Sequence, residues 1–191
     1  MNAVIDAILS RRSVRRYKSD TVSLNVIQQI VEAGLHAPNA MGRQAWHIVV
    51  ASDADKIAEI DHEVKAATAR MPNNPYKSFV GNESYTINYH APVFVIVSGN
   101  VIESPRNIQL DCALVLGNMF LAAHSLGVGS CWINQLSVLN EEPDFRRFMS
   151  RLGIPENNNI FGCACFGYAD GQVSQAAKRR ENNVVYYTKK Q

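Results

Sequence analysis

The stretch IQLDCALVLGNMFLAAHSLGVGSCWINQ, residues 108–135, decides how the rest of the chain is organised. From Ile108 to Leu126 apolar residues occur on every helical face, Asp111 is the only formal charge, and Ala, Leu and Met favour a helix. The pattern predicts the core helix of a soluble domain, buried on all sides. Asp111 and Asn118 interrupt the apolar residues, so no run approaches the roughly 20 residues needed to cross a bilayer.

The end of this predicted helix contains two glycines. Gly127 ends the helix, and Gly129 precedes a short strand-like piece from Ser130 to Ile133. Glycine allows a ligand to approach the backbone closely, and the helix behind fixes the position of the turn. We therefore expect this turn to offer backbone N–H groups to a ligand.

The overall composition is that of an ordinary globular domain. The chain has 191 residues, 47% of them hydrophobic, and a formal net charge of +2, which favours neither nucleic acid nor a membrane surface as a partner. We expect a single domain over residues 1–191. The first thirty residues contain charges throughout and lack the apolar segment of a signal peptide, so a cytoplasmic location is expected.

Outside the central stretch, the spacing of apolar residues predicts further helices and strands. Helices are expected at 3–10, 24–36, 53–70 and 143–152, and strands at 46–51, 93–98 and 160–168. Residues 71–89 have no clear period, and both a mobile flap over a cleft and an irregular surface loop fit them. A strand-like piece, VVYY at 184–187, has no neighbouring partner strand in the sequence.

Two basic clusters lie near the two ends of the chain and could converge on one anion. RRSVRRY at 11–17 places four arginines around Ser13, and KRR occupies 178–180. Both a solvated surface patch and a phosphate clamp fit the first cluster, since guanidinium groups bind phosphate oxygens in pairs. The loop PNAMGRQ at 38–44 fits either a plain connector or a binding loop.

Several common catalytic arrangements are missing from the sequence. It has no GxSxG elbow, HExxH helix, Walker motif or Rossmann fingerprint, and its five histidines are dispersed. The four cysteines lack the spacing of a zinc site and are expected to be buried thiols. Cys163 and Cys165 are expected to face opposite sides of the last strand, which argues against a redox pair. The basic clusters and the glycine turn therefore favour a cofactor that supplies its own chemistry.

Five stretches, in the same order along the chain, resemble the FMN-dependent nitroreductase family. RRSVRRY resembles its N-terminal phosphate motif, R-[RH]-S-x-[RK]-x-[FY], and APNAMGRQAWHIVVA at 37–51 resembles its APSAxNxQPWxFxVV stretch. DCALVLGNMFLAAHSLGVGSCWI at 111–133 is similar to the family's DxxxxxxNMxLAAxxLGLGSCWI helix and turn. LGIPENNNIFGCACFGYADG at 152–171 resembles LGIPxxxxxxxxxxxGYP, and KRR at 178–180 is similar to the late KPRR.

The resemblance implies an α+β, nitroreductase-like fold with a central, mostly antiparallel sheet wrapped by helices. It also implies an obligate homodimer with one FMN at each of two interface sites and a C-terminal extension exchanged between the subunits. The piece at 184–187 would then pair with a strand of the partner.

By position, the resemblance assigns the cofactor contacts. The phosphate and ribityl chain would be held by Arg11, Arg12, Ser13 and Arg15, together with Lys178 and Arg180, or Arg179 if the register is shifted by one. Pro38, Asn39 and Ala40, and also Gln44, would reach the flavin from the partner subunit. The ring would be lined by Trp132, Ile133, Asn134 and Gln135, with the N–H groups of the last two near flavin N5 and O4.

The implied activity is ping-pong transfer of a hydride from NAD(P)H through flavin N5 to an acceptor such as a nitroaromatic or a quinone, with no side-chain catalyst. Two alternatives stay open: a flavoprotein of this fold with another reaction, such as flavin reduction or dehalogenation, and a flavin-binding protein without turnover. Four positions depart from the family pattern. Gly42 replaces Asn, Asn39 replaces Ser, Ala45 replaces Pro and Gly117 replaces Glu.

Overall fold

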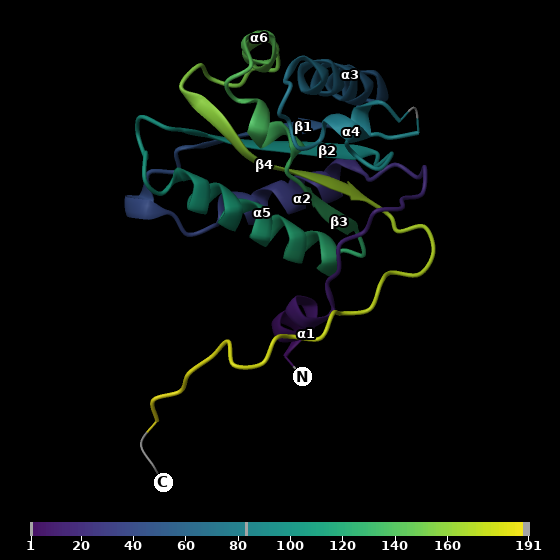
Figure 1. The fold of residues 1–191 in the computed structure, drawn as a ribbon. Helices are drawn as coiled ribbons and strands as arrows, with labels where there is room; N and C mark the ends of the chain where they lie inside the picture. The colour runs from purple at the N-terminus through teal and green to yellow at the C-terminus, as the bar shows by residue number, and fades with distance from the viewer. Residues whose placement is uncertain (1, 83, 189–191) are drawn as a thin grey trace.

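A four-stranded antiparallel sheet with helices on both faces forms the body of the molecule, as the computed structural model of residues 2–82 and 84–188 shows (Figure 1). The strands are β1 (Trp46–Ala51), β2 (Val93–Asn100), β3 (Gly129–Ile133) and β4 (Asn158–Gly167), arranged in the order β1-β2-β4-β3. All of the strand pairs are antiparallel. The expected α+β class with an antiparallel sheet is therefore confirmed, and β1 and β3 form the two edges.

One face of the sheet is covered by α3 (Ala54–Arg70), η2 (Gln135–Leu139) and α6 (Pro143–Arg151), with the single-turn α4 (Lys77–Val80) beside them. Phe94 and Ile96 of β2 point into this layer together with both Cys163 and Cys165. The expectation that these two cysteines face opposite sides is wrong, because strand side chains alternate and residues two apart share a face. All four cysteines of the chain are buried and unbridged.

The other face is covered by α2 (Leu24–Leu35) and α5 (Ile108–Ser125), which pack on Val93, Val95 and Val97 of β2. Among the described residues, α5 is also the one helix whose 18 residues and mean hydropathy of 1.2 would suit a membrane span by composition alone. In this fold it lies against the sheet and α2 instead.

The prediction that the helix at 108–126 is buried on all sides is wrong for a single chain. The side with Cys112, Val115 and Met119 is fully buried, whereas Leu110 and Leu114 are 63% and 46% exposed. The sheet and α2 lie on one side of α5 and leave the other apolar side uncovered. The apolar pattern of α5 therefore predicts more burial than packing within one chain provides.

Side chains at the helix starts explain where several of the predicted helices begin. Ser23 accepts a hydrogen bond from the Val26 N–H at the start of α2, and Asp53 accepts one from the Lys56 N–H at the start of α3. Glu142 plays the same part for α6, whose first residue is a proline. These caps place the helices within one or two residues of the predicted bounds.

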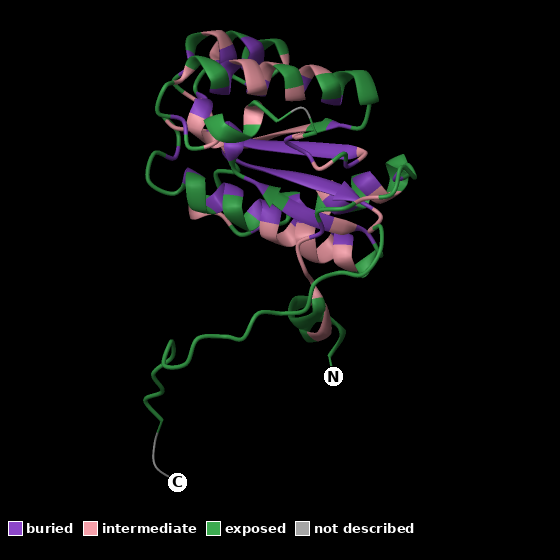
Figure 2. Ribbon diagram, turned by 45° about the vertical axis from the view of Figure 1, so that its right-hand side comes forward, coloured by how far each residue is buried: buried purple, intermediate pink, exposed green. Residues whose placement is uncertain are grey.

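Two segments stand away from the body, as Figures 1 and 2 show. The first is α1 (Ala3–Ser10), which has no buried residue although Val4 and Ile8 are apolar. The second is the tail, in which every described residue from 170 to 188 is exposed. The strand-like piece at 184–187 is extended and pairs with no described strand of its own chain.

Candidate functional site

The first basic cluster runs along the outer edge of β3. After α1 the chain is extended, Ser13 forms a parallel bridge with Ser130, and the Val14 N–H donates to the Ser130 carbonyl at 2.9 Å. A second bridge joins Tyr17 to Ala169, just beyond β4. The segment therefore covers the first half of the β3 edge and leaves the second half open.

Successive side chains of this extended segment point to opposite sides. Burial raises the pKa of the Cys131 thiol, while Arg15, Ser13 and Arg11 beside it act in the opposite direction, so these three groups lie together near Cys131. The Arg12 guanidinium donates instead to the carbonyls of Leu9 and Arg11, at 2.7 and 2.6 Å. The structure thus gathers the odd-numbered members of the cluster and turns Arg12 back onto its own segment.

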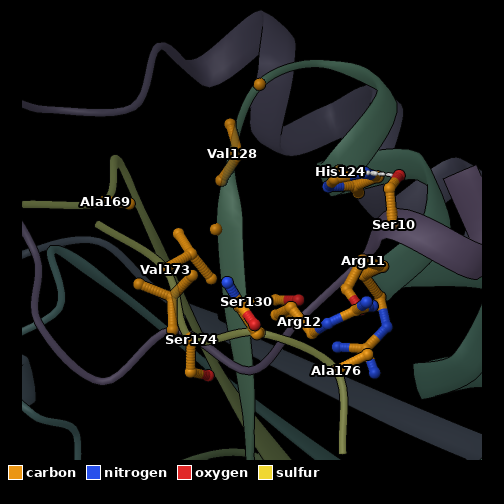
Figure 3. Close-up of a pocket in the computed structure, with 14 residues that line it drawn as sticks. Ser10, Arg11, Arg12, His124, Val128, Ser130, Ala169, Val173, Ser174 and Ala176 are labelled. Carbon is orange, nitrogen blue, oxygen red and sulfur yellow. Dashed lines mark hydrogen bonds between the residues drawn. The ribbon is translucent and has the colours of Figure 1, made fainter. Parts of the chain in front are cut away.

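Two cavities flank this segment where the tail passes it. The larger, of about 490 Å³, lies between the end of α1, the end of α5 and tail residues 173–176, and Arg11 and Arg12 are among the residues that line it (Figure 3). On its wall the His124 ring nitrogen Nε2 lies 2.7 Å from the Ser10 hydroxyl. The smaller, of about 260 Å³, is lined by Ser13, Arg15 and tail residues 169–174. Positive groups and hydroxyls thus surround a space large enough for an anionic ligand.

The open half of β3 continues directly from these cavities. The Ser130 carbonyl points away from β4 toward Val14, and backbone groups alternate in an antiparallel pair, so the N–H and C=O of Trp132 point the same way. The Trp132 ring, 36% exposed, meets the Phe120 ring edge-on at a centroid distance of 6.3 Å. The Arg11 guanidinium lies 5.8 Å from the centre of that Phe120 ring. A continuous surface therefore joins the basic cluster to the end of β3.

The turn after β3 is held by side chains. Gln135 is 2% exposed, accepts a hydrogen bond from the Tyr85 hydroxyl and donates one to the Thr68 hydroxyl at 3.1 Å. The Trp132 indole N–H donates to Asn134 Oδ1 at 3.5 Å. Tyr85 lies within residues 71–89, where the sequence has no period, so nothing in the sequence indicated that it reaches this turn.

The loop at 38–44 has a constrained backbone. Met41, Gly42 and Gln44 have φ angles of 58°, 65° and 49°, in the left-handed region that favours glycine. Asn39 Oδ1 accepts a hydrogen bond from the Gln44 N–H at 2.9 Å, and Asp111 Oδ1 accepts one from the Ala40 N–H at 3.2 Å. Asn and Gly are the residues that best tolerate a positive φ, which accounts for Gly42 at a position where Asn is usual.

The structure separates this loop from the basic cluster within one chain. Pro38, Asn39, Ala40 and Gln44 precede β1 at one edge of the sheet, whereas residues 11–15 and 132–135 lie at the β3 edge. Two strands stand between, and strands are spaced by about 4.8 Å, so the edges are about 14 Å apart. Lys178 and Arg180 lie on the exposed tail just past the larger cavity, where Lys178 pairs with Glu181 at 2.9 Å.

Comparison with known proteins adds a family match over most of the chain. A model of the nitroreductase family matches residues 8–168. A Methanothermobacter thermautotrophicus protein, provisionally named NADH dehydrogenase/NAD(P)H nitroreductase, is 30% identical over 167 residues, which are 86% of this chain and 76% of that protein. A Vibrio harveyi NADPH-flavin oxidoreductase is 27% identical over 199 residues, covering 98% of this chain and 74% of the relative.

Solved structures agree with the sequence matches. A Bacteroides fragilis nitroreductase with bound FMN superimposes with a TM-score of 0.90 and 34% identity, covering 98% of this chain and 100% of that one. A Desulfitobacterium hafniense nitroreductase, also with bound FMN, gives a TM-score of 0.84 and 25% identity, with 98% and 100% coverage.

Proposed function

The chain belongs to the nitroreductase family, and on this premise we propose that it is an FMN-dependent oxidoreductase that uses NADH or NADPH. The proposed acceptors are small molecules such as nitroaromatics and quinones. The observation that supports the proposal most is the close likeness, over nearly the whole chain, to a nitroreductase structure with bound FMN. We also propose that the protein acts in the cytoplasm, a location that fits its use of NADH or NADPH.

The donor groups beside β3 suit the phosphate of such a cofactor. Arg11, Ser13 and Arg15 lie together near Cys131, and guanidinium groups bind phosphate oxygens strongly and in pairs. Ser130, on the wall of the larger cavity, is 2% exposed and its hydroxyl has no partner in the described residues. Lys178 and Arg180 would add positive charge from the tail, and Arg12 would contribute charge rather than a direct contact.

The open end of β3 suits the flat part of the cofactor. Trp132 offers apolar surface, whereas the Ile133 side chain is 7% exposed and packs in the core, so Ile133 would contribute only its backbone. The turn at Asn134 and Gln135 is fixed by the hydrogen bonds of its side chains. When bound, FMN would supply the hydride chemistry, so the chain needs only to bind, orient and exclude water. Backbone N–H groups of this turn would face the developing negative charge, where preorganised donors are most effective.

We propose that the working form is a homodimer. Leu110 and Leu114 of α5 and Val4 and Ile8 of α1 are each 46% to 63% exposed, and monomeric proteins rarely leave such apolar faces uncovered. A second copy would cover these faces. It would also bring its own loop at 38–44 to the β3 edge, because within one chain that loop lies at the opposite edge.

The tail has a fitting partner surface at the open edge of β1. Val184, Val185, Tyr186 and Tyr187 are 61% to 97% exposed, although they are residues that favour strands. A groove of about 520 Å³ beside β1 is lined by Leu24, Ile27, Val31 and Val50, together with the polar Gln28, Glu32 and Ser52. An exposed strand edge readily takes up another strand, so the tail of one copy would extend the sheet of the other.

The first test is the absorbance spectrum of the purified protein, followed by anaerobic addition of NADH or NADPH. We expect two flavin bands that bleach on addition and return with a quinone or a nitroaromatic. Bands that resist NAD(P)H would favour a flavoprotein of this fold with another reaction. Bleaching without reoxidation by any acceptor would favour a flavin-binding protein without turnover, and a colourless protein that ignores added FMN would refute the proposal.

The phosphate clamp has its own test, in which Arg11→Ala and Ser13→Ala each remove one donor. We expect each variant to purify with markedly less FMN and to bind it about tenfold or more weakly, because a hydrogen bond to a charged group contributes about 1.5–3 kcal/mol. Lys18→Ala is the matched control, since it removes a positive charge from the same segment and the exposed Lys18 lines neither of the two cavities. Full flavin occupancy in both test variants would refute this clamp.

A further inference from the structure

Residues 71–89, which no sequence pattern explained, reach the turn after β3 through one side chain. The Tyr85 hydroxyl donates to Gln135 Oε1, and Gln135 Nε2 donates to Thr68 Oγ1 at 3.1 Å. The Thr68 hydroxyl donates in turn to the Val64 carbonyl of α3 at 2.7 Å. Thr68 and Gln135 are 0% and 2% exposed, so the two inner bonds are buried, whereas the bond from the half-buried Tyr85 lies at the outer end of the chain.

The Val64 carbonyl, at one end of this chain, determines which group donates in every one of its hydrogen bonds. A backbone carbonyl only accepts, so the Thr68 hydroxyl must donate to Val64, which leaves the Thr68 oxygen free to accept from Gln135. The amide oxygen of Gln135 then faces Tyr85 and needs a donor. Burial, together with the nearby Tyr89 and Asp61, raises the pKa of Tyr85 to about 12, so the phenol keeps its proton at neutral pH.

The Tyr85 ring is also fixed from other sides. The Lys65 ammonium lies 5.7 Å from the ring centre and pairs with Asp61 at 2.8 Å. Asp61 also accepts a hydrogen bond from the Ile87 N–H at 2.8 Å, which anchors the backbone two residues after Tyr85. The Phe79 ring lies on Tyr85 with centroids 5.7 Å apart. The hydroxyl is therefore held in place before any ligand arrives.

We propose that Tyr85 is a positioning residue for the flavin-facing turn and acts through Gln135. The inference rests on the proposed function, under which Asn134 and Gln135 present backbone N–H groups to the cofactor. By fixing the Gln135 side chain between Tyr85 and Thr68, the chain of hydrogen bonds fixes the backbone from which those N–H groups project. It also connects Tyr85, from a segment without a sequence pattern, to the proposed site.

The variant Tyr85→Phe removes one hydroxyl and leaves Gln135 Oε1 buried without a donor. Because an unsatisfied buried acceptor is costly, we expect the turn to relax and its N–H groups to lose their alignment. The bleaching of bound flavin by NADH should slow about five- to tenfold, the usual effect of about one lost hydrogen bond. The midpoint potential of the flavin should become more negative, while FMN affinity should change less, because the clamp at Arg11 and Ser13 is untouched.

A second set of variants separates positioning from simple loss of stability. Thr68→Val breaks the other end of the hydrogen-bond chain and should reproduce the shifts in rate and potential, whereas Thr68→Ser keeps the hydroxyl and should restore both. Tyr76→Phe is the matched control in the same segment, because the Tyr76 hydroxyl makes no hydrogen bond within the described residues. In the protein without FMN, amide exchange at Ser137, whose N–H donates to Asn134, should accelerate in Tyr85→Phe and Thr68→Val but not in Tyr76→Phe.

The outcomes distinguish this inference from the proposed function. If flavin binds and is bleached normally while Tyr85→Phe changes neither Ser137 exchange nor the flavin potential, Tyr85 has no positioning role and the proposed function stands. If Tyr76→Phe gives the same shifts as Tyr85→Phe, the effect is general to the segment and the inference fails. If the unaltered protein takes up no FMN, the proposed function fails first, and the flavin role of Tyr85 fails with it.

Discussion

Gly162 of β4 illustrates how a single residue without a side chain places another. A Cβ atom built at Gly162 would lie 2.5 and 2.7 Å from two carbons of the Trp132 indole and 2.8 Å from Leu116. The indole can approach β4 this closely only because Gly162 has no side chain. Trp132 is one of the residues proposed to line the cofactor, so Gly162 controls the shape of the site without touching a ligand.

We predict that Gly162→Ala displaces Trp132. The free energy of unfolding should fall by about 1–3 kcal/mol, as expected for overpacking, and FMN should bind more weakly. Tryptophan fluorescence, denaturant titration and flavin titration measure these effects. Gly117→Ala is the control, because a Cβ at Gly117 meets nothing within 4 Å and a helical alanine is more stable than glycine. Equal behaviour of the two variants would contradict the packing argument.

At the scale of elements, an ion pair joins the end of α3 to the start of α6. Arg70 donates to both carboxylate oxygens of Glu142 at 2.9 Å, and Glu142 also caps α6 through the Phe145 N–H. The hydrogen bond from Arg70 is the main reason why the pKa of Glu142 lies below its ordinary value, with the Phe145 N–H acting in the same direction against burial. Glu142 is largely buried, but Arg70 is 39% exposed, so solvent weakens the pair.

This lowered pKa predicts a definite pH dependence. A carboxyl group with a lower pKa in the folded state stabilises the fold above its unfolded pKa of about 4.3, and this stabilisation is lost as the pH falls through the folded pKa. We expect Arg70→Gln to lower the free energy of unfolding by about 1 kcal/mol at neutral pH. The difference from the unaltered protein should shrink below about pH 4.3 and vanish once folded Glu142 is protonated.

Denaturant titrations over a pH series measure this difference. Lys56→Gln is the control, because Lys56 pairs with Glu59 within one helix and both side chains are more exposed, so its loss should have almost no effect. A difference between Arg70→Gln and the unaltered protein that stays constant down to low pH would show that Arg70 acts by packing rather than by charge.

Another element, the loop at 38–44 before β1, has a strained backbone that side chains hold in place. Its three left-handed residues are held by the Asn39 side chain from within and by Asp111 of α5 from outside. The second oxygen of Asp111 is buried without a partner in the described residues. The one charge in the first part of the central helix thus serves the loop rather than the helix, and it holds a strained backbone in the form proposed to meet the cofactor of the partner.

At the scale of the whole molecule, α1, the outer side of α5 and the tail share one property. They are apolar or strand-forming, and a single chain leaves them uncovered. Packing against a second copy would satisfy all three, while each would remain an exposed liability in a monomer. The edge of β1 is a further surface that one chain leaves uncovered. The other edge of the sheet, β3, is already partly covered by residues 11–17.

We predict that removing residues 181–191 weakens the dimer and leaves Lys178 and Arg180 in place. The dissociation constant should rise about a hundredfold or more, since each buried Val or Tyr side chain contributes about 1–2 kcal/mol and 1.4 kcal/mol is tenfold. FMN should be lost on dilution, and the melting temperature should depend on protein concentration. Sedimentation over a concentration series measures the association.

A shortened chain that dimerises as tightly as the full one would mean that residues 181–188 are not exchanged. The apolar sides of α1 and α5 would then have to account for the whole interface.

The sequence by itself determined the elements and the kind of chemistry. Apolar spacing, caps and glycines are local signals, so they predicted the helices and strands, and the arginine segment with the glycine turn predicted an anion and cofactor site. Only the tertiary structure decided which side chains meet. It showed that Arg11, Ser13 and Arg15 lie near Cys131, that α5 is open on one side, and that Tyr85 holds Gln135. These contacts join residues far apart in the chain, and no local pattern encodes them because they arise only when the sheet and its covering layers pack together. The shared face of Cys163 and Cys165 is different, because it follows from strand alternation alone.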